Sequence, residues 1–125
     1  MSACAQAVEL FEDATGDIAL GDLEAAIGKY RQCVALDPQY FDAWHALGMA
    51  LMKAGHFAEA IAAGLRAVDL NPNDQLAWSS LSLFYVRNSQ IPEAEAAGAK
   101  AKVISWGGKI RKDAETRGEG DAGNG

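Results

Sequence analysis

Residues 41–72 read FDAWHALGMALMKAGHFAEAIAAGLRAVDLNP, and this stretch decides the fold. Apolar residues recur every three or four positions across residues 44–51, which predicts an amphipathic helix. The pattern breaks at Ala-Gly-His, residues 54–56, and resumes across residues 57–68 as a second helix. Asn71-Pro72 ends the second helix because proline lacks an amide donor and disfavours helical geometry in the residue before it. The stretch therefore predicts a helical hairpin, and one hairpin alone cannot bury both apolar faces.

The hairpin repeats along the chain with a period of about 34 residues. A forward shift by one period superimposes Trp44 on Trp78, and a backward shift superimposes Gly55 on Gly21 and Pro72 on Pro38. Three copies follow, at about residues 7–40, 41–74 and 75–108. Together they predict six helices, at about residues 3–19, 23–36, 41–54, 57–70, 75–88 and 91–105.

The motif Trp-x-x-Leu-Gly, a glycine in the turn, a small residue at Ala60 and a proline after the second helix resemble the tetratricopeptide repeat (TPR). The resemblance covers about residues 7–104 and implies an all-α fold, a right-handed superhelical solenoid of three helix-turn-helix hairpins. We expect a TPR domain at residues 1–105 and a short capping segment at residues 106–117. Gly107-Gly108 either stops the sixth helix or interrupts a helix that resumes. The glycine-rich residues 118–125 are expected to be a disordered tail.

Three departures from the family pattern carry expectations of their own. In the first copy Leu10 replaces the tryptophan, so the first helix could shift its register or fray. Gly64 and Gly98 stand where the family usually has an aromatic residue, which only Tyr30 keeps. We expect a neighbouring large side chain to pack at these glycines. Both tryptophans of the motif are expected to be large buried wedges.

Composition narrows the possible functions. The net charge of −6 disfavours nucleic acid as a partner, because phosphates demand clustered Lys and Arg. No apolar run approaches the roughly 20 residues that a bilayer span requires, and the N-terminus has no targeting pattern, so we expect no membrane partner and a cytoplasmic location. Cys4 and Cys33 form no disulfide framework or metal motif, and Cys33 is expected to be a small buried residue.

The sequence does not predict an enzyme. His45 and His56 have no carboxylate or thiol partner at a useful spacing, and Gly107-Gly108-Lys109 lacks the spacing of a phosphate-binding loop. We therefore expect no catalytic residue, no metal and no cofactor.

The resemblance also implies that the first helix of each hairpin lines a concave surface. On those helices, the residues that do not face the partner helix form a stripe that is apolar in the middle with charges at its margins. We expect this stripe to hold a peptide or helix of a partner protein, as a scaffold or adaptor. The alternative is that these residues only pack inside the chain itself. The expected groove residues are Phe11, Thr15, His45, Met49, Met52, Lys53, Ser79, Leu83, Val86 and Arg87.

A well-known use of this family is to bind the acidic tail of heat-shock chaperones through a clamp of Lys, Arg and Asn side chains. The matching positions here carry none of these residue types, so a chaperone-tail adaptor is not expected. They hold Phe11, Thr15, Ala46, Leu76 and Ser80.

A second hypothesis is a self-assembling scaffold, a homo-oligomer formed through the terminal repeats. Every Asp, Glu, Lys or Arg up to and including Glu24 is acidic, whereas Lys and Arg gather from Lys100 onward. Opposite ends of two copies could therefore attract each other. The same polarity could equally serve solubility alone.

Overall fold

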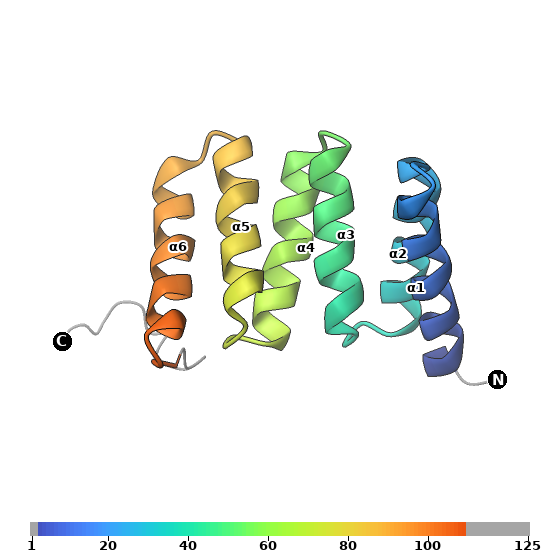
Figure 1. Cartoon of the computed structure of the whole chain (residues 1–125), viewed down its shortest axis with the longest axis horizontal. Coiled ribbons are helices and arrows are strands. Elements are labelled where there is room, and N and C mark those ends of the chain that lie inside the picture. Colours follow the sequence, from blue (N-terminus) through green and yellow to red (C-terminus); the bar gives the residue numbers. More distant parts are fainter. Residues whose placement is uncertain (1–2, 110–125) are drawn as a thin grey trace.

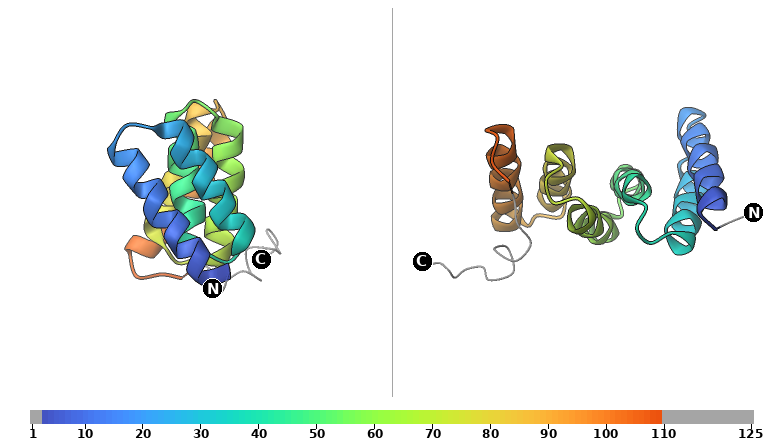
Figure 2. Two further views of the ribbon diagram at one scale, coloured as in Figure 1. Left: turned by 90° about the vertical axis from the view of Figure 1, so that its right-hand side faces the viewer. Right: turned by 90° about the horizontal axis from the view of Figure 1, so that it is seen from below.

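The computed structural model of the chain describes residues 3–109, which form six α-helices and no strand. The helices follow one another in a row, so that α1 and α6 lie at opposite ends (Figure 1). The three hairpins step along this row as a helical repeat solenoid (Figure 2). The predicted helices agree with those observed to within one residue at each end. Their bounds are α1 (Ala3–Ala19), α2 (Leu23–Leu36), α3 (Phe41–Lys53), α4 (Phe57–Leu70), α5 (Gln75–Arg87) and α6 (Ile91–Ser105).

The turn inside each hairpin uses the same backbone geometry three times. At Gly55 the backbone has a φ of 87°, and the amide of His56 donates to the carbonyl of Leu51 over 2.9 Å. Gly21 repeats this turn with a φ of 83°, and Ser89 repeats it with a φ of 62°. Such a left-handed residue after a helix satisfies the carbonyls that its last turn leaves open. The repeated turn therefore folds each pair of helices back on itself.

Gly107 decides how the sixth helix ends. Its φ of 89° forms the same kind of cap, in which the amide of Gly108 donates to the carbonyl of Val103 over 2.9 Å. The helix α6 therefore stops at Ser105 and does not run through the glycines. Most of the segment 106–117, and the whole of 118–125, lies outside the described residues.

Small side chains let the two helices of each hairpin approach closely. Ala26, Ala60 and Ala94 occupy equivalent positions on the three second helices, and all three are buried. The first helix α1 is continuous from Ala3 to Ala19 and keeps its close contact, because Ala14, at the position of Gly48, is fully buried. Its neighbour Asp13 is exposed where the second hairpin buries Leu47.

Phe84 of α5 supplies the large side chain expected at Gly64. A Cβ atom at Gly64 would lie 3.1 Å from Cδ2 of Phe84, and one at Gly48 would lie 2.9 Å from its Cε2. The ring is fully buried, because α3 and α4 both give it room through a glycine. The helix α5 thus packs on the second hairpin through this ring between two glycines, together with Leu81, whose Cδ1 would also lie 3.1 Å from a Cβ at Gly64.

The two tryptophans differ from the expectation that both are buried. Trp78 is buried, but Trp44 is only partly so. Leu65 and Trp78 line the same pocket. One period earlier, the residue equivalent to Leu65 is Arg31, and its guanidinium pairs with the carboxylate of Glu59 over 3.0 Å. The prediction of a buried wedge is therefore wrong for Trp44, since the preceding hairpin has the exposed and charged Arg31 at the position where the next hairpin has Leu65.

The two tryptophans nevertheless make the same two kinds of contact, with residues that are equivalent by the repeat. The indole nitrogen of Trp44 donates to the carbonyl of Pro38 over 2.7 Å, and that of Trp78 donates to Pro72 over the same distance. A cation lies over each ring, Arg66 at 5.5 Å from the centroid of Trp44 and Lys100 at 5.0 Å from that of Trp78. These contacts tie each turn between hairpins to the second helix that follows.

Cys33 is the buried small residue that the sequence predicts. Its thiol donates to the carbonyl of Ala7 over 3.0 Å, which joins α2 to α1. Burial raises the pKa of this thiol, as expected for a structural cysteine.

Candidate functional site

The predicted groove residues lie on α1, α3 and α5, the first helices of the three hairpins. Phe11, Thr15 and His45 contact side chains of other helices. Met49 and Met52 are partly buried, and the remaining five are exposed, as Thr15 also is: Lys53, Ser79, Leu83, Val86 and Arg87.

Phe11 of α1 belongs to an aromatic cluster. Its ring lies 5.7 Å from that of Tyr30 and 5.3 Å from that of Tyr40, at the start of α3. The hydroxyl of Thr15 donates to the carbonyl of Phe11 over 2.9 Å and lies 3.1 Å from the hydroxyl of Tyr30. The contact with Tyr40 joins the first hairpin to the second and the others lie within the first hairpin, so Phe11 acts first as a packing residue.

His45 connects α3 to α5. Its Nε2 lies 3.0 Å from the hydroxyl oxygen of Ser80, and its ring stacks on Phe41 with the planes 3° apart. Burial lowers the pKa of His45 below its ordinary value of 6.5, although Asp74 and Asp42 oppose the shift. Burial thus favours the neutral imidazole, and its hydrogen bond to Ser80 holds α3 against α5.

Beyond His45, α3 and α5 carry pairs of side chains that are equivalent by the repeat, and together these form the α3–α5 face. Met49 and Met52 of α3 are partly buried against the core. Leu83, equivalent to Met49, is 37% exposed, and Val86, equivalent to Met52, is 47% exposed. Ser79, equivalent to His45, is exposed. The face therefore presents adaptable apolar side chains on two neighbouring helices.

Two cations close this face at one end. Lys53 and Arg87 stand in the last turns of α3 and α5, and both are exposed. A basic residue in the last turn also complements the negative end of the helix dipole, which is reason enough for a cation there. Lys53 additionally lines a pocket of about 210 Å³ with Ile18 and Leu23, between the first two hairpins.

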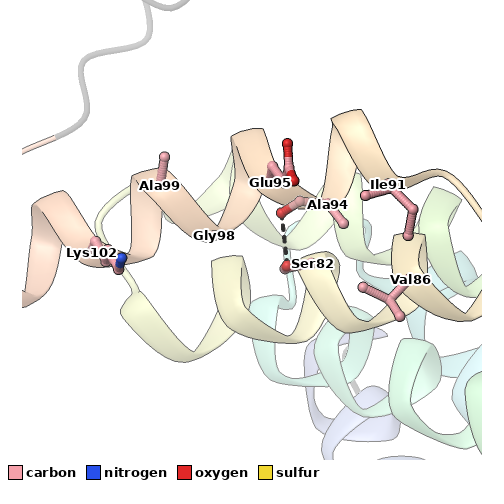
Figure 3. A pocket seen from close by; sticks show the side chains of 8 residues that line it. All are labelled: Ser82, Val86, Ile91, Ala94, Glu95, Gly98, Ala99 and Lys102. Carbon is pink, nitrogen blue, oxygen red and sulfur yellow. Dashed lines mark hydrogen bonds between the residues drawn. The ribbon is translucent and has the colours of Figure 1, made fainter.

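A larger pocket opens between α5 and α6 (Figure 3). It has a volume of about 450 Å³, and Ser82, Val86, Ile91, Glu95, Gly98 and Lys102 are among the residues that line it. The hydroxyl of Ser82 donates to the carbonyl of Ala94 over 2.8 Å and holds the two helices together at its floor. Val86, which the sequence assigned to the groove, thus lies at the border between two surfaces.

The described residues show no arrangement typical of a metal or membrane site. Within residues 3–109, no three His, Cys, Asp or Glu side chains gather closely enough to hold a metal ion. In the same range, no helix is long and apolar enough to cross a bilayer.

The sequence matches a family model of the tetratricopeptide repeat over residues 17–84. Because this match covers more than half of the chain, the chain belongs to the tetratricopeptide repeat family. The family fold is generally a non-catalytic protein-interaction fold, so the chain is a protein–protein interaction module. No curated protein sequence matches the chain.

Solved structures share this fold. A crystal structure of MamA has a TM-score of 0.76 and 24% identity over 80% of this chain, and the chain spans 58% of that protein. The first TPR of Spaghetti (RPAP3) bound to the HSP90 peptide SRMEEVD has a TM-score of 0.77 and 21% identity, covering 81% of this chain and 80% of that one. The CopN–Scc3 complex gives a TM-score of 0.75 and 20% identity, with 78% and 58% covered. At these identities the likeness concerns the fold alone.

Sequence reasoning missed two features of the surface. The contact between His45 and Ser80 joins side chains on different hairpins, and their spacing in the sequence carries no signal of it. The pocket between α5 and α6 did have a signal, since Gly98 departs from the aromatic residue that the family usually has at this position.

Proposed function

We propose that this module binds a peptide or helix of a partner protein across α3 and α5. The observation that carries the proposal is the contact between His45 and Ser80, which joins α3 to α5. Met49 and Leu83, equivalent by the repeat, each stand about one helical turn beyond that contact on their own helix. Leu83 is exposed and Met49 is only partly buried, so both can give up apolar surface to a ligand. The contact between His45 and Ser80 holds the two helices in place, which lowers the entropy lost on binding.

The charges indicate which ligand fits. Lys53 and Arg87 are equivalent by the repeat, so they lie at the same end of α3 and α5. An apolar segment with an acidic residue at that end would contact Met49 and Leu83 through its apolar side chains and pair its carboxylate with Lys53 or Arg87. The face would not serve as a carboxylate clamp, because the clamp positions on α1, α3 and α5 carry no basic or asparagine side chain.

Binding to the double variant Met49→Glu/Leu83→Glu tests this proposal. The immobilised protein is incubated with an extract of its native cell, and retained proteins are identified by mass spectrometry. A specific partner of the native protein should be lost from the double variant, because two buried carboxylates would oppose an apolar ligand. Circular dichroism should show unchanged helicity, since neither side chain is fully buried.

The matched control is Leu36→Glu, which places a carboxylate on α2. Leu36 is 38% exposed, close to Leu83, and lies outside the predicted stripe, so this variant should retain the partner. Retention of the same partner by the Met49/Leu83 variant would refute binding at this face. Loss of the partner from both variants with intact helicity would also contradict the proposal, because the binding site would then not be confined to α3 and α5.

A further inference from the structure

The pocket between α5 and α6 repeats an interface that is already occupied inside the chain. Moving back one period from Ser82, Gly98 and Lys102 gives Gly48, Gly64 and Val68. There the next helix, α5, covers α3 and α4, and Phe84 places its fully buried ring against both glycines. In the third hairpin no described helix covers the equivalent surface, and the pocket of about 450 Å³ stands in its place (Figure 3).

The first two hairpins fill the space at the position of Gly98 with an aromatic ring in two different ways. In the first hairpin Tyr30 stands where Gly64 stands in the second, and its buried ring packs beside Phe11. The next hairpin then carries only Ala50 at the position equivalent to Phe84. In the second hairpin a glycine leaves the space and the following helix supplies the ring. Gly98 leaves the same space, but the prediction of a large neighbouring side chain is wrong there among residues 3–109, because only the Ser82 hydroxyl, at 3.5 Å, lies within 4 Å of a Cβ built at Gly98.

We infer that an α-helix of another protein docks on α5 and α6 and inserts an aromatic side chain against Gly98. The apolar wall for that ring comes from Val86 and Ile91, which are 47% and 49% exposed. Burying an aromatic ring between small residues is a typical anchor of a protein–protein interface. This surface is separate from the face of Met49 and Leu83, apart from Val86 at the border.

Two charged residues of α6 indicate which charges the docking helix should carry. Glu95 and Lys102 are exposed on α6 at the positions of the buried Ile61 and Val68. They are separated by about 10 Å along the helix and stand on either side of Gly98. A helix that docks there should therefore place a basic side chain toward Glu95, its aromatic ring at Gly98 and an acidic side chain toward Lys102.

Neither a second copy nor the remaining sequence supplies this helix well. The outer face of α1 has Glu9, Asp13 and Gly16 where α5 has Ala77, Leu81 and Phe84, so a copy stacked end to end would bring two carboxylates and no ring. Within the printed sequence, residues 107–125 contain no aromatic residue. We therefore commit to a helix of a different protein as the occupant.

A peptide with the sequence of residues 74–87, DQLAWSSLSLFYVR, is the natural probe because it already fills the equivalent site in the second hairpin. The probe is hydrocarbon-stapled to hold it helical and labelled for fluorescence anisotropy. We expect saturable binding to the full chain, weakened about tenfold or more when the phenylalanine of the peptide becomes alanine. No saturable binding at millimolar protein would overturn the inference.

Gly98→Tyr and Ile91→Glu are the test variants of the protein. The first copies the ring of Tyr30 into the third hairpin, and the second puts a charge on the pocket wall, at the first residue of α6 where an acid suits the helix dipole. Each should weaken the probe about tenfold or more, whereas Ala62→Tyr, at an exposed position of α4 away from the pocket, should bind as the native protein does. Unchanged binding by Gly98→Tyr would overturn the inference.

Four further measurements distinguish the two surfaces and the possible occupants of the pocket. The Met49→Glu/Leu83→Glu variant should bind the probe normally, and Gly98→Tyr should still capture a partner of the α3–α5 face. A dimer in sedimentation velocity that Gly98→Tyr dissolves would assign the pocket to a second copy. Chemical-shift changes confined to residues 110–125 in Gly98→Tyr would assign it to the chain itself. Either of these two results would overturn the inference of a partner protein.

Discussion

Ser89 adopts the same left-handed backbone conformation as Gly55, its equivalent in the preceding hairpin, with φ values of 62° and 87°. The amide after each residue closes the cap, from Gln90 to the carbonyl of Tyr85 over 2.8 Å and from His56 to that of Leu51 over 2.9 Å. Glycine adopts this conformation without cost, but a residue with a Cβ atom does not. The third hairpin therefore keeps the turn and accepts backbone strain at Ser89.

We expect Ser89→Gly to raise the free energy of unfolding by about 1 kcal/mol, because it removes the Cβ clash of the left-handed conformation. Gly55→Ser introduces the same clash in the second hairpin and should lower the free energy by a similar amount. Urea unfolding followed by circular dichroism measures both. Equal stabilities for Ser89→Gly and the native protein would show that the turn relaxes around the serine.

Glycines inside the helices should respond in opposite ways to alanine. A Cβ atom at Gly48 would lie 2.9 Å from the buried ring of Phe84, whereas one at Gly28 of α2 would meet nothing within 4 Å. Overpacking costs about 1–3 kcal/mol and the gain in helix propensity is about 1 kcal/mol. We therefore expect Gly28→Ala to stabilise the protein by about 0.5–1 kcal/mol and Gly48→Ala to destabilise it by about 1 kcal/mol. Stabilisation by both substitutions would mean that Phe84 can move.

The two motif tryptophans should not be equally important for stability. Trp78→Ala should cost about 3–5 kcal/mol, because the side chain is buried and its indole nitrogen donates to Pro72. Trp44→Ala should cost clearly less, since the ring is partly exposed although its donation to Pro38 is equally short. Urea unfolding of both variants tests the order. A larger loss for Trp44→Ala would indicate that burial is not the dominant contribution.

The sequence predicted the helices well because their signals are local. The regular spacing of the repeat, the glycine turns and the prolines after the second helices set the bounds within one residue. The turn at Ser89 carried no glycine, yet the repeat alone placed it correctly. Equivalence by the repeat thus replaced a missing local signal.

The candidate site was less predictable because it depends on contacts between hairpins. A helical projection places Phe11 and His45 on the outward stripe, but Tyr40 covers the first and Ser80 bonds to the second. Partner residues of this kind come from another helix, so no period within one helix reveals them. Leu83 is exposed, as the helical projection predicts, because no later hairpin follows α5 and α6 in the described part of the chain to cover it.

His45 should make stability depend on pH in the range just below its ordinary pKa of 6.5. Burial lowers its pKa in the folded protein below 6.5, while Asp74 and Asp42 only partly oppose this effect. Between the lowered pKa and 6.5 the unfolded chain binds more protons than the folded one, so stability rises with pH in this window. The contribution is fully present above pH 6.5 and is lost as the pH falls toward the lowered value. His45→Gln has no titrating ring but can still bond to Ser80, so its stability should change less across the window. Urea unfolding at several pH values between about 5 and 8 measures this difference, and parallel profiles for the two proteins would show that His45 titrates alike in both states.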